Sequence, residues 1–79
     1  MSETTIYCVQ TYWKDRRRLN MGDLRQFKDE GMARSSADRA SKRQDGVVLY
    51  AITGDPDVDF WDEPVVLAAH GETPLSAEA

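Results

Sequence analysis

Residues 46–71 have the sequence GVVLYAITGDPDVDFWDEPVVLAAHG, and this stretch decides the fold. Two apolar runs, residues 47–52 and 65–69, flank an acidic connection and are rich in β-branched residues. Each run is bounded by Gly or Pro and is too short for an ordinary helix, so both are predicted to be strands. Because neither run alternates between apolar and polar residues, both strands are expected to be covered on both faces.

The first half of the chain adds further strands. Residues 4–13 are rich in strong β-formers and predict a strand. Residues 24–28 alternate like a short edge strand, and the alternative is that they begin a helix. We favour the strand, because Gly31 would interrupt a helix that began at Asp23.

One helix is predicted over residues 30–44, with Asp29 as its N-cap and an end before Gly46. Its small residues recur at helical spacing and are expected to face the sheet. They are Ala33, Ala37 and Ala40, with Met32, Ser36 and Ser41 at the borders of the stripe.

These elements predict an α+β fold, in which a mainly antiparallel sheet of three to four strands has one helix packed on one face. The expected order is β-(β)-α-β-β. Residues 1–71 are expected to form a single domain and residues 72–79 a flexible C-terminal tail. With 79 residues, the chain is near the lower size limit for a self-sufficient core.

Composition narrows the class of protein. The single cysteine, Cys8, excludes an internal disulfide framework and a zinc site built from several cysteines. No apolar run approaches 18 residues, and the first five residues lack the basic start of a signal peptide. We therefore expect a soluble cytoplasmic protein with no membrane association.

The charges are strongly segregated along the chain. The net charge is −4, yet all ten basic residues lie between Lys14 and Arg43. Eight of the fourteen acidic residues follow Gln44, where there is no basic residue. Such asymmetry is typical of a nucleic-acid-binding face, or of basic and acidic surfaces that meet within one molecule or between two copies.

Several segments of residues 25–74 carry a family resemblance. They are Arg25-Gln26-Phe27-Lys28 before the alanine-spaced helix, Gly46-Val47-Val48, Thr53-Gly54-Asp55-Pro56-Asp57, Asp62-Glu63-Pro64-Val65-Val66-Leu67-Ala68, His70-Gly71-Glu72 and Pro74. Together they resemble a small uncharacterised bacterial protein family. The resemblance implies one compact domain, and because no activity is known for that family it implies no functional residues.

Neither a metal site nor a catalytic set is predicted. Asp55, Asp57 and Asp59 have the spacing that opens a calcium loop, but Phe60 and Val66 stand where that loop needs Gly and Glu. An irregular cation site that also uses Asp62 or Glu63 is the alternative to a solvated hairpin tip.

Cys8 and His70 could be combined with an aspartate as nucleophile, base and orienting group. The thiol lies in mid-strand with no sharp turn or oxyanion loop beside it, which favours a small core residue instead. We therefore predict no catalytic residues, no cofactor and no enzymatic activity.

The interaction surface is predicted by comparing the two apolar faces of the sheet with the single helix available to cover them. One helix covers one face of the sheet, so the other face, called the open face below, is expected to expose apolar residues. A second copy is favoured as its cover, which predicts a homodimer. The alternative is that the acidic loop and the tail fold back over it. Phe60, Trp61 and Tyr50 are the predicted partner-binding residues, because two large aromatics on an acidic loop are unusual.

The function predicted from these features is a small non-enzymatic interaction or regulatory module acting as a homodimer. The alternative is a nucleic-acid-binding domain, in which Arg16, Arg17 and Arg18 contact phosphate while Tyr12 and Trp13 stack on bases.

Overall fold

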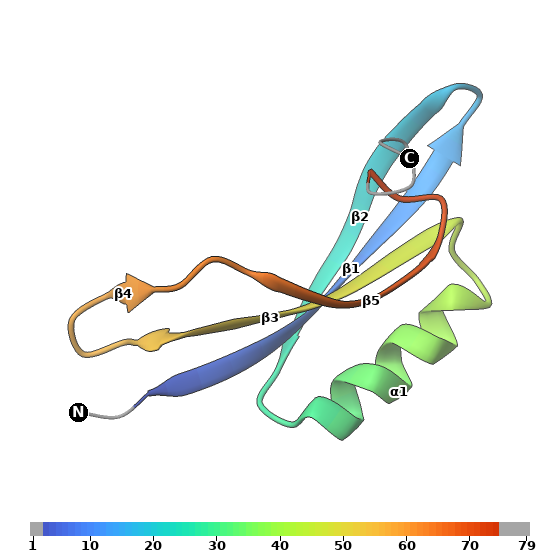
Figure 1. Ribbon diagram of the computed structural model, residues 1–79. Helices are drawn as coiled ribbons and strands as arrows, with labels where there is room; N and C mark the ends of the chain where they lie inside the picture. Colours follow the sequence, from blue (N-terminus) through green and yellow to red (C-terminus); the bar gives the residue numbers. More distant parts are fainter. Residues whose placement is uncertain (1–2, 75–79) are drawn as a thin grey trace.

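The computed structural model describes residues 3–74 and contains a mainly antiparallel sheet with one helix, which confirms the α+β class (Figure 1). The elements in chain order are β1 (Thr4–Asp15), β2 (Arg18–Phe27), α1 (Glu30–Ser41), β3 (Gly46–Asp55), β4 (Phe60–Trp61) and β5 (Val65–Gly71). The sheet has five strands instead of the predicted three to four. The additional one, β4, has only two residues and lies within the segment predicted to be a loop.

The sheet is built around β1 and β3, which pair over almost their whole length. β2 lies on the outer side of β1, and both β4 and β5 pair with the outer edge of β3. All four pairings are antiparallel. β4 pairs at the Gly54 end of β3 and β5 at the Gly46 end, so the strands form a long twisted ribbon (Figure 1).

The β1–β2 hairpin is longer than predicted. Residues 24–28 were predicted to be a strand, and the strand alternative is confirmed, although β2 starts at Arg18. β1 runs two residues past Trp13, and Asp15 pairs with Arg18 around a two-residue turn. Lys14 and Asp15 at the end of β1 are polar and exposed, and residues 18–23 of β2 are mostly exposed, so backbone pairing contributes more than apolar burial here.

A bulge lets β2 pass through Gly22 and Asp23, which are poor strand formers. The register shifts between Gln10 and Tyr12 at this point. The Thr11 hydroxyl accepts a hydrogen bond from the Asp23 amide at 2.8 Å, and the Gln10 side-chain amide donates to the Gly22 carbonyl at 3.1 Å. Two buried polar side chains of β1 therefore replace the missing ladder hydrogen bonds.

The helix begins as predicted and ends early. The Asp29 carboxylate accepts hydrogen bonds from the backbone amides of Gly31 and Met32, which confirms it as the N-cap. The last helical residue is Ser41, three residues before the predicted end. The amides of Arg43 and Gln44 both donate to the Ala40 carbonyl, so the chain tightens into a turn there.

The core lies between α1 and the middle of the sheet. Its fully buried members are Val9, Ala33, Ala37, Val47 and Leu49. Ala33 and Ala37 face the sheet as predicted and Ala40 is half-buried, whereas Met32 is exposed. Because the helix contributes only small side chains, it lies close to the strands. At twelve residues, this helix is also too short to cross a bilayer.

Ala37→Leu is expected to lower the free energy of unfolding by about 1–3 kcal/mol, because a larger side chain has no space between α1 and the sheet. Thermal unfolding followed by circular dichroism measures the loss. Ser35→Leu, on the exposed side of the same helix, is the matched control and is expected to change stability by less than about 0.5 kcal/mol. Equal melting curves for wild type and Ala37→Leu would contradict this packing.

Part of the segment predicted to be a flexible tail contacts the sheet. The Glu72 amide donates to the Asp45 carbonyl at 2.8 Å, and Thr73 is buried. Gly71 has a φ of +68°, which turns the chain back toward the sheet in a conformation that favours glycine. Residues 75–79 of the predicted tail lie outside the described residues.

Candidate functional site

The open face is the side of the sheet opposite α1. Register defines its members, because side chains of one strand alternate between the two faces. Val9 and Leu49 point into the core, so their neighbours in β1 and β3 point the other way. The open face includes Ile6, Cys8, Gln10 and Tyr12 of β1, Val48, Tyr50 and Ile52 of β3, Leu19, Met21, Leu24 and Gln26 of β2, and Val66 and Ala69 of β5.

The chain covers both ends of the open face. A Cβ atom at Gly46 would lie 3.1 Å from the Thr73 side chain, so Thr73 sits on this face at one end of β3. A Cβ atom at Gly54 would lie 2.6 Å from the Trp61 ring, so Trp61 covers the other end. Because Gly46 and Gly54 have no side chain, the segments that carry Thr73 and Trp61 can lie directly against β3. These segments cover the two ends of the open face and leave its middle without such a cover.

A groove of about 320 Å³ opens beside Trp61 on this face. It is lined by Ile6, Cys8, Gln26, Ile52, Trp61 and Asp62. The Trp61 indole is held in place by its Nε1–H, which donates to the Asp59 carboxylate at 3.3 Å. The groove therefore has apolar walls with one amide and one carboxylate among its lining residues.

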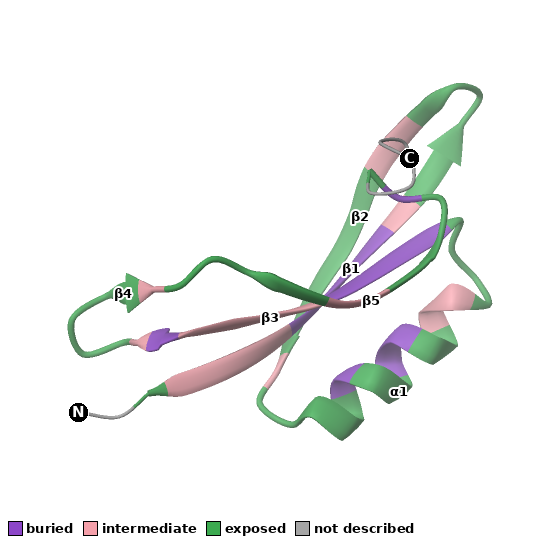
Figure 2. Ribbon diagram, in the orientation of Figure 1, coloured by how far each residue is buried: buried purple, intermediate pink, exposed green. Residues whose placement is uncertain are grey.

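Large apolar side chains remain accessible on the open face. Met21 is 70% exposed, Leu24 50% and Val66 47%, and the half-buried Tyr50 and Ile52 lie between them. Figure 2 shows the outer strands β2 and β5 largely exposed, while the central strands are buried or half-buried except at the hairpin end of β1. Met21, Leu24 and Val66 were not predicted as site residues, because only the strand register assigns them to one face.

The three predicted partner-binding residues do not lie together. Tyr50 and Trp61 share the open face. Trp61 pairs with Gly54, which lies four residues after Tyr50 in β3 and therefore on the same face of the strand. Phe60 pairs with Asp55 and therefore points to the opposite face, where it is exposed. The alternation within a two-residue strand thus separates the adjacent aromatics.

The three arginines predicted to contact nucleic acid lie at the tip of the β1–β2 hairpin, where all are exposed. Trp13 is also exposed, whereas Tyr12 is half-buried. As neighbours in β1, Tyr12 and Trp13 point to opposite faces, so they cannot stack on bases along one side of the hairpin. The structure brings Trp13 near the arginines and leaves Tyr12 on the open face.

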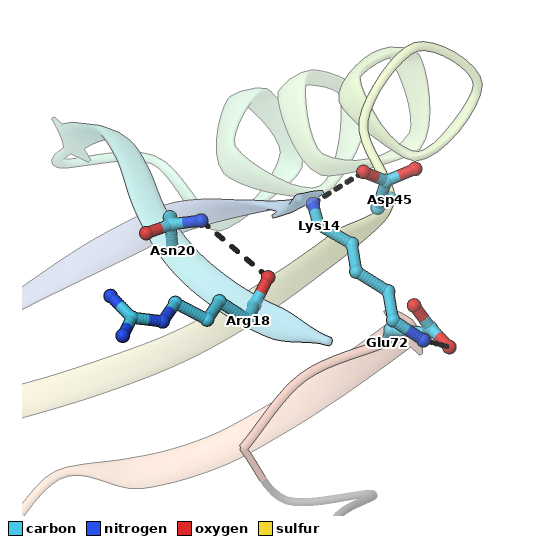
Figure 3. A network of polar contacts seen from close by, with 5 residues as sticks. All are labelled: Lys14, Arg18, Asn20, Asp45 and Glu72. Atoms are coloured by element: carbon cyan, nitrogen blue, oxygen red, sulfur yellow. Dashed lines mark hydrogen bonds and ion pairs between the residues drawn. The ribbon is translucent and has the colours of Figure 1, made fainter. Parts of the chain in front are cut away.

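Lys14 anchors the base of the hairpin tip to two acidic residues from distant parts of the chain (Figure 3). Its amide donates to the Asp45 carboxylate at 2.6 Å, and its side-chain nitrogen lies 3.0 Å from Glu72 Oε1. In the facing strand, the side-chain amide of Asn20 donates to the Arg18 backbone carbonyl at 3.5 Å. Because Lys14 and Glu72 are both exposed, the ion pair contributes less than about 1 kcal/mol and serves mainly to fix geometry.

The acidic loop, residues 55–63, forms the opposite end of the ribbon. Its turn is shaped by the Asp55 carboxylate, which accepts from the Asp57 amide at 3.0 Å, and by Asp59 with a φ of 53°. Within residues 3–74, no group of three or more His, Cys, Asp or Glu side chains is arranged to hold a metal ion. The absence of a metal site, predicted from the spacing, stays a prediction.

Cys8 and His70 lie on opposite faces of the sheet. Cys8 is buried on the open face, whereas His70 pairs with Val47 and is exposed on the side of the helix. Burial raises the pKa of the Cys8 thiol, an effect that a hydrogen bond with Tyr50 partly offsets. The structure therefore does not assemble this candidate nucleophile with a base, and it disfavours the thiolate.

Cys8 is expected to react with a thiol reagent about a hundredfold more slowly in the native protein than in the unfolded chain, because burial limits access and raises its pKa. Colour development with Ellman's reagent at pH 8, with and without guanidinium, measures the ratio. Because the raised pKa lets the folded chain hold the thiol proton more tightly than the unfolded chain, folding stability is expected to fall as the pH rises from the ordinary thiol pKa through the folded-state value. Rapid native labelling would mean that the open face is accessible down to β1.

Comparison with known protein families, curated proteins and solved structures gave no match. The resemblance to a small bacterial family therefore stays a prediction.

Proposed function

We propose that this protein is a non-enzymatic interaction or regulatory module that acts as a homodimer through the open face of its sheet. The observation that carries this proposal is the exposure of Met21, Leu24 and Val66 on one face that α1 does not cover. Trp61 and Thr73 cover only the two ends of that face. Large apolar side chains left exposed on one face of a small domain are typical of an interface.

The area available suits a second copy of the chain. A standard interface buries about 800 Å² on each partner, roughly one seventh of the 5860 Å² of surface that this chain exposes. The ribbon has an extent of 46 Å along its longest axis and 24 Å along the next, so one broad face provides such an area. Stacking two open faces would give each sheet a second apolar layer.

Charge favours one orientation of that dimer. From the central pair Val9–Leu49, β1 runs six residues to Asp15 at the basic tip, and β3 runs six residues the opposite way to Asp55 at the acidic loop. At about 3.3 Å per residue, both charged ends lie about 20 Å from the centre. A two-fold axis that lies between the two open faces, perpendicular to the long axis of the ribbon, would place each basic tip over the acidic loop of the partner.

The oligomeric state tests the homodimer. Light scattering on a sizing column is expected to give about twice the 8.9 kDa chain mass at high micromolar concentration. A mass equal to one chain under these conditions would refute the proposal.

A charge exchange tests the orientation. Arg17→Glu with Arg18→Glu in one chain, and Asp57→Lys with Glu63→Lys in another, each place like charges together in a homodimer. Each variant alone is expected to dissociate, whereas the mixture restores a dimer in which every tip meets an opposite charge. Variants that all dimerise like the wild type would refute this orientation and leave the homodimer standing.

The second candidate function is nucleic-acid binding by the hairpin tip. Arg16 has a φ of 58°, a region that costs a residue with a Cβ atom about 1–2 kcal/mol. The two-residue turn between Asp15 and Arg18 accounts for this φ, so the candidate rests on the exposure of the arginines at the tip and of Trp13. Mobility shifts with single-stranded RNA and DNA at two salt concentrations test this, since contacts to phosphate weaken steeply with salt. No shift at low salt would remove this candidate.

A further inference from the structure

A cleft lined by three arginines lies between α1 and β2, on the side of the sheet away from the open face. Ser36, Arg39 and Ala40 share one face of the helix, and Arg43 follows in the turn after its C-cap. Arg25 of β2 pairs with Val9 in the sheet, so its side chain lies on the helix side. These five residues line a cleft of about 170 Å³, called the arginine cleft below.

Within the described residues, 3–74, no carboxylate forms an ion pair with an arginine of this cleft. The ion pairs within residues 3–74 are Lys14–Glu72, Arg34–Glu30 and Lys42–Asp38, and none of them involves Arg25, Arg39 or Arg43. Three arginines, from β2, α1 and the turn after α1, thus line one cleft and have no ion-pair partner among residues 3–74, in a chain whose net charge is −4. Like charges held together repel one another, and an anion between them would remove the repulsion.

The helix dipole explains only part of this arrangement. Arg39 lies in the last turn of α1 and Arg43 directly after it, where a positive charge interacts favourably with the helix C-terminus. Arg25 belongs to a neighbouring strand, and an edge strand needs only some charge, of either sign, to resist aggregation. The helix dipole therefore does not explain why Arg25 lines the same cleft as Arg39 and Arg43.

We infer that the arginine cleft binds a phosphate group. The planar guanidinium fork matches pairs of phosphate oxygens, and three such forks around one group can donate to all of them. Ser36, which is nearly buried at the cleft, adds a hydroxyl donor. Four oxygens at about 30 Å³ each, the share of a water molecule, fit within the 170 Å³ available.

This site is independent of the proposed homodimer. Arg25 lies on the face of β2 opposite Leu24, so a partner on the open face would leave the arginine cleft accessible. Phosphate binding and dimerisation can therefore be measured separately on the same protein.

Isothermal titration calorimetry with inorganic phosphate and with adenosine monophosphate, against chloride at equal ionic strength, tests the inference. One saturable site per chain is expected for at least one of the two. The tighter ligand then indicates whether the natural source is a free phosphate or a phosphate ester. Arg25→Gln and Arg39→Gln are each expected to weaken binding about tenfold, since each removes a charge-assisted hydrogen-bonding group.

Arg34→Gln is the matched control, because Arg34 lies on the same helix and pairs with Glu30 outside the cleft. It is expected to leave the affinity unchanged. All three substitutions are at exposed positions, so unaltered circular dichroism spectra are expected to show that the variants fold. The inference is overturned if neither ligand gives a saturable signal, or if Arg34→Gln weakens binding as much as Arg25→Gln does.

Discussion

Gly46→Ala is expected to lower the free energy of unfolding by about 3 kcal/mol, although it adds one methyl group. A Cβ atom at this position would overlap the Glu72 carbonyl oxygen and lie 2.6 Å from the carbonyl carbon. Both atoms belong to the backbone, so no side-chain rotation relieves the overlap. The chain after Gly71 would have to leave the sheet, and the burial of Thr73 would be lost with it.

Chemical denaturation of wild type and variant measures this loss. Gly31→Ala is the matched control, since a Cβ atom there meets only the Asp29 side chain, at 3.5 Å. Alanine is the better helix former, so this control is expected to be neutral or to stabilise by up to about 1 kcal/mol. Equal stabilities for Gly46→Ala and wild type would mean that residues 72 and 73 do not lie against Gly46.

The sequence predicts Gly46 as a strand boundary, but it does not predict that residues 72 and 73 pack against Gly46. Apolar content and flanking Gly or Pro identified the runs that became β3 and β5, and Asp29 marked the helix start. These are local features, each set by a few neighbouring residues. The close approach of Glu72 to Gly46 joins residues far apart in the chain, and no local pattern encodes it.

The same distinction applies to the candidate site. Counting one helix against strands apolar on both sides was enough to predict an open face. Its membership depends on the register, because a shift of one residue exchanges the two faces of a strand. Phe60 and Trp61, like Tyr12 and Trp13, are adjacent in the sequence and suggest one shared surface. Because adjacent side chains of a strand point to opposite faces, the two members of each pair lie on different faces of the sheet. The convergence of Arg25 with the helix arginines likewise follows from the pairing of β2 with β1.

Leu24→Glu is expected to raise the dissociation constant of the proposed homodimer about a hundredfold, equivalent to about 2.7 kcal/mol of binding free energy. Leu24 pairs with Gln10, so it lies about half-way along the open face, on the outer strand β2, where its side chain is 50% exposed. Apolar residues enclosed in an interface contribute most to binding, and a carboxylate there would be removed from water without a partner. Sedimentation equilibrium over a range of concentrations measures the constant.

Val65→Glu is the matched control for this effect. Val65 is an equally accessible β-strand residue, but it pairs with Ala51 and points away from the open face. It is therefore expected to leave the dissociation constant within about threefold of the wild type, as for surface substitutions remote from an interface. Because both side chains are accessible in the single chain, neither variant is expected to lose much folding stability. If Val65→Glu dissociates the dimer and Leu24→Glu does not, the interface lies on the helix side of the sheet.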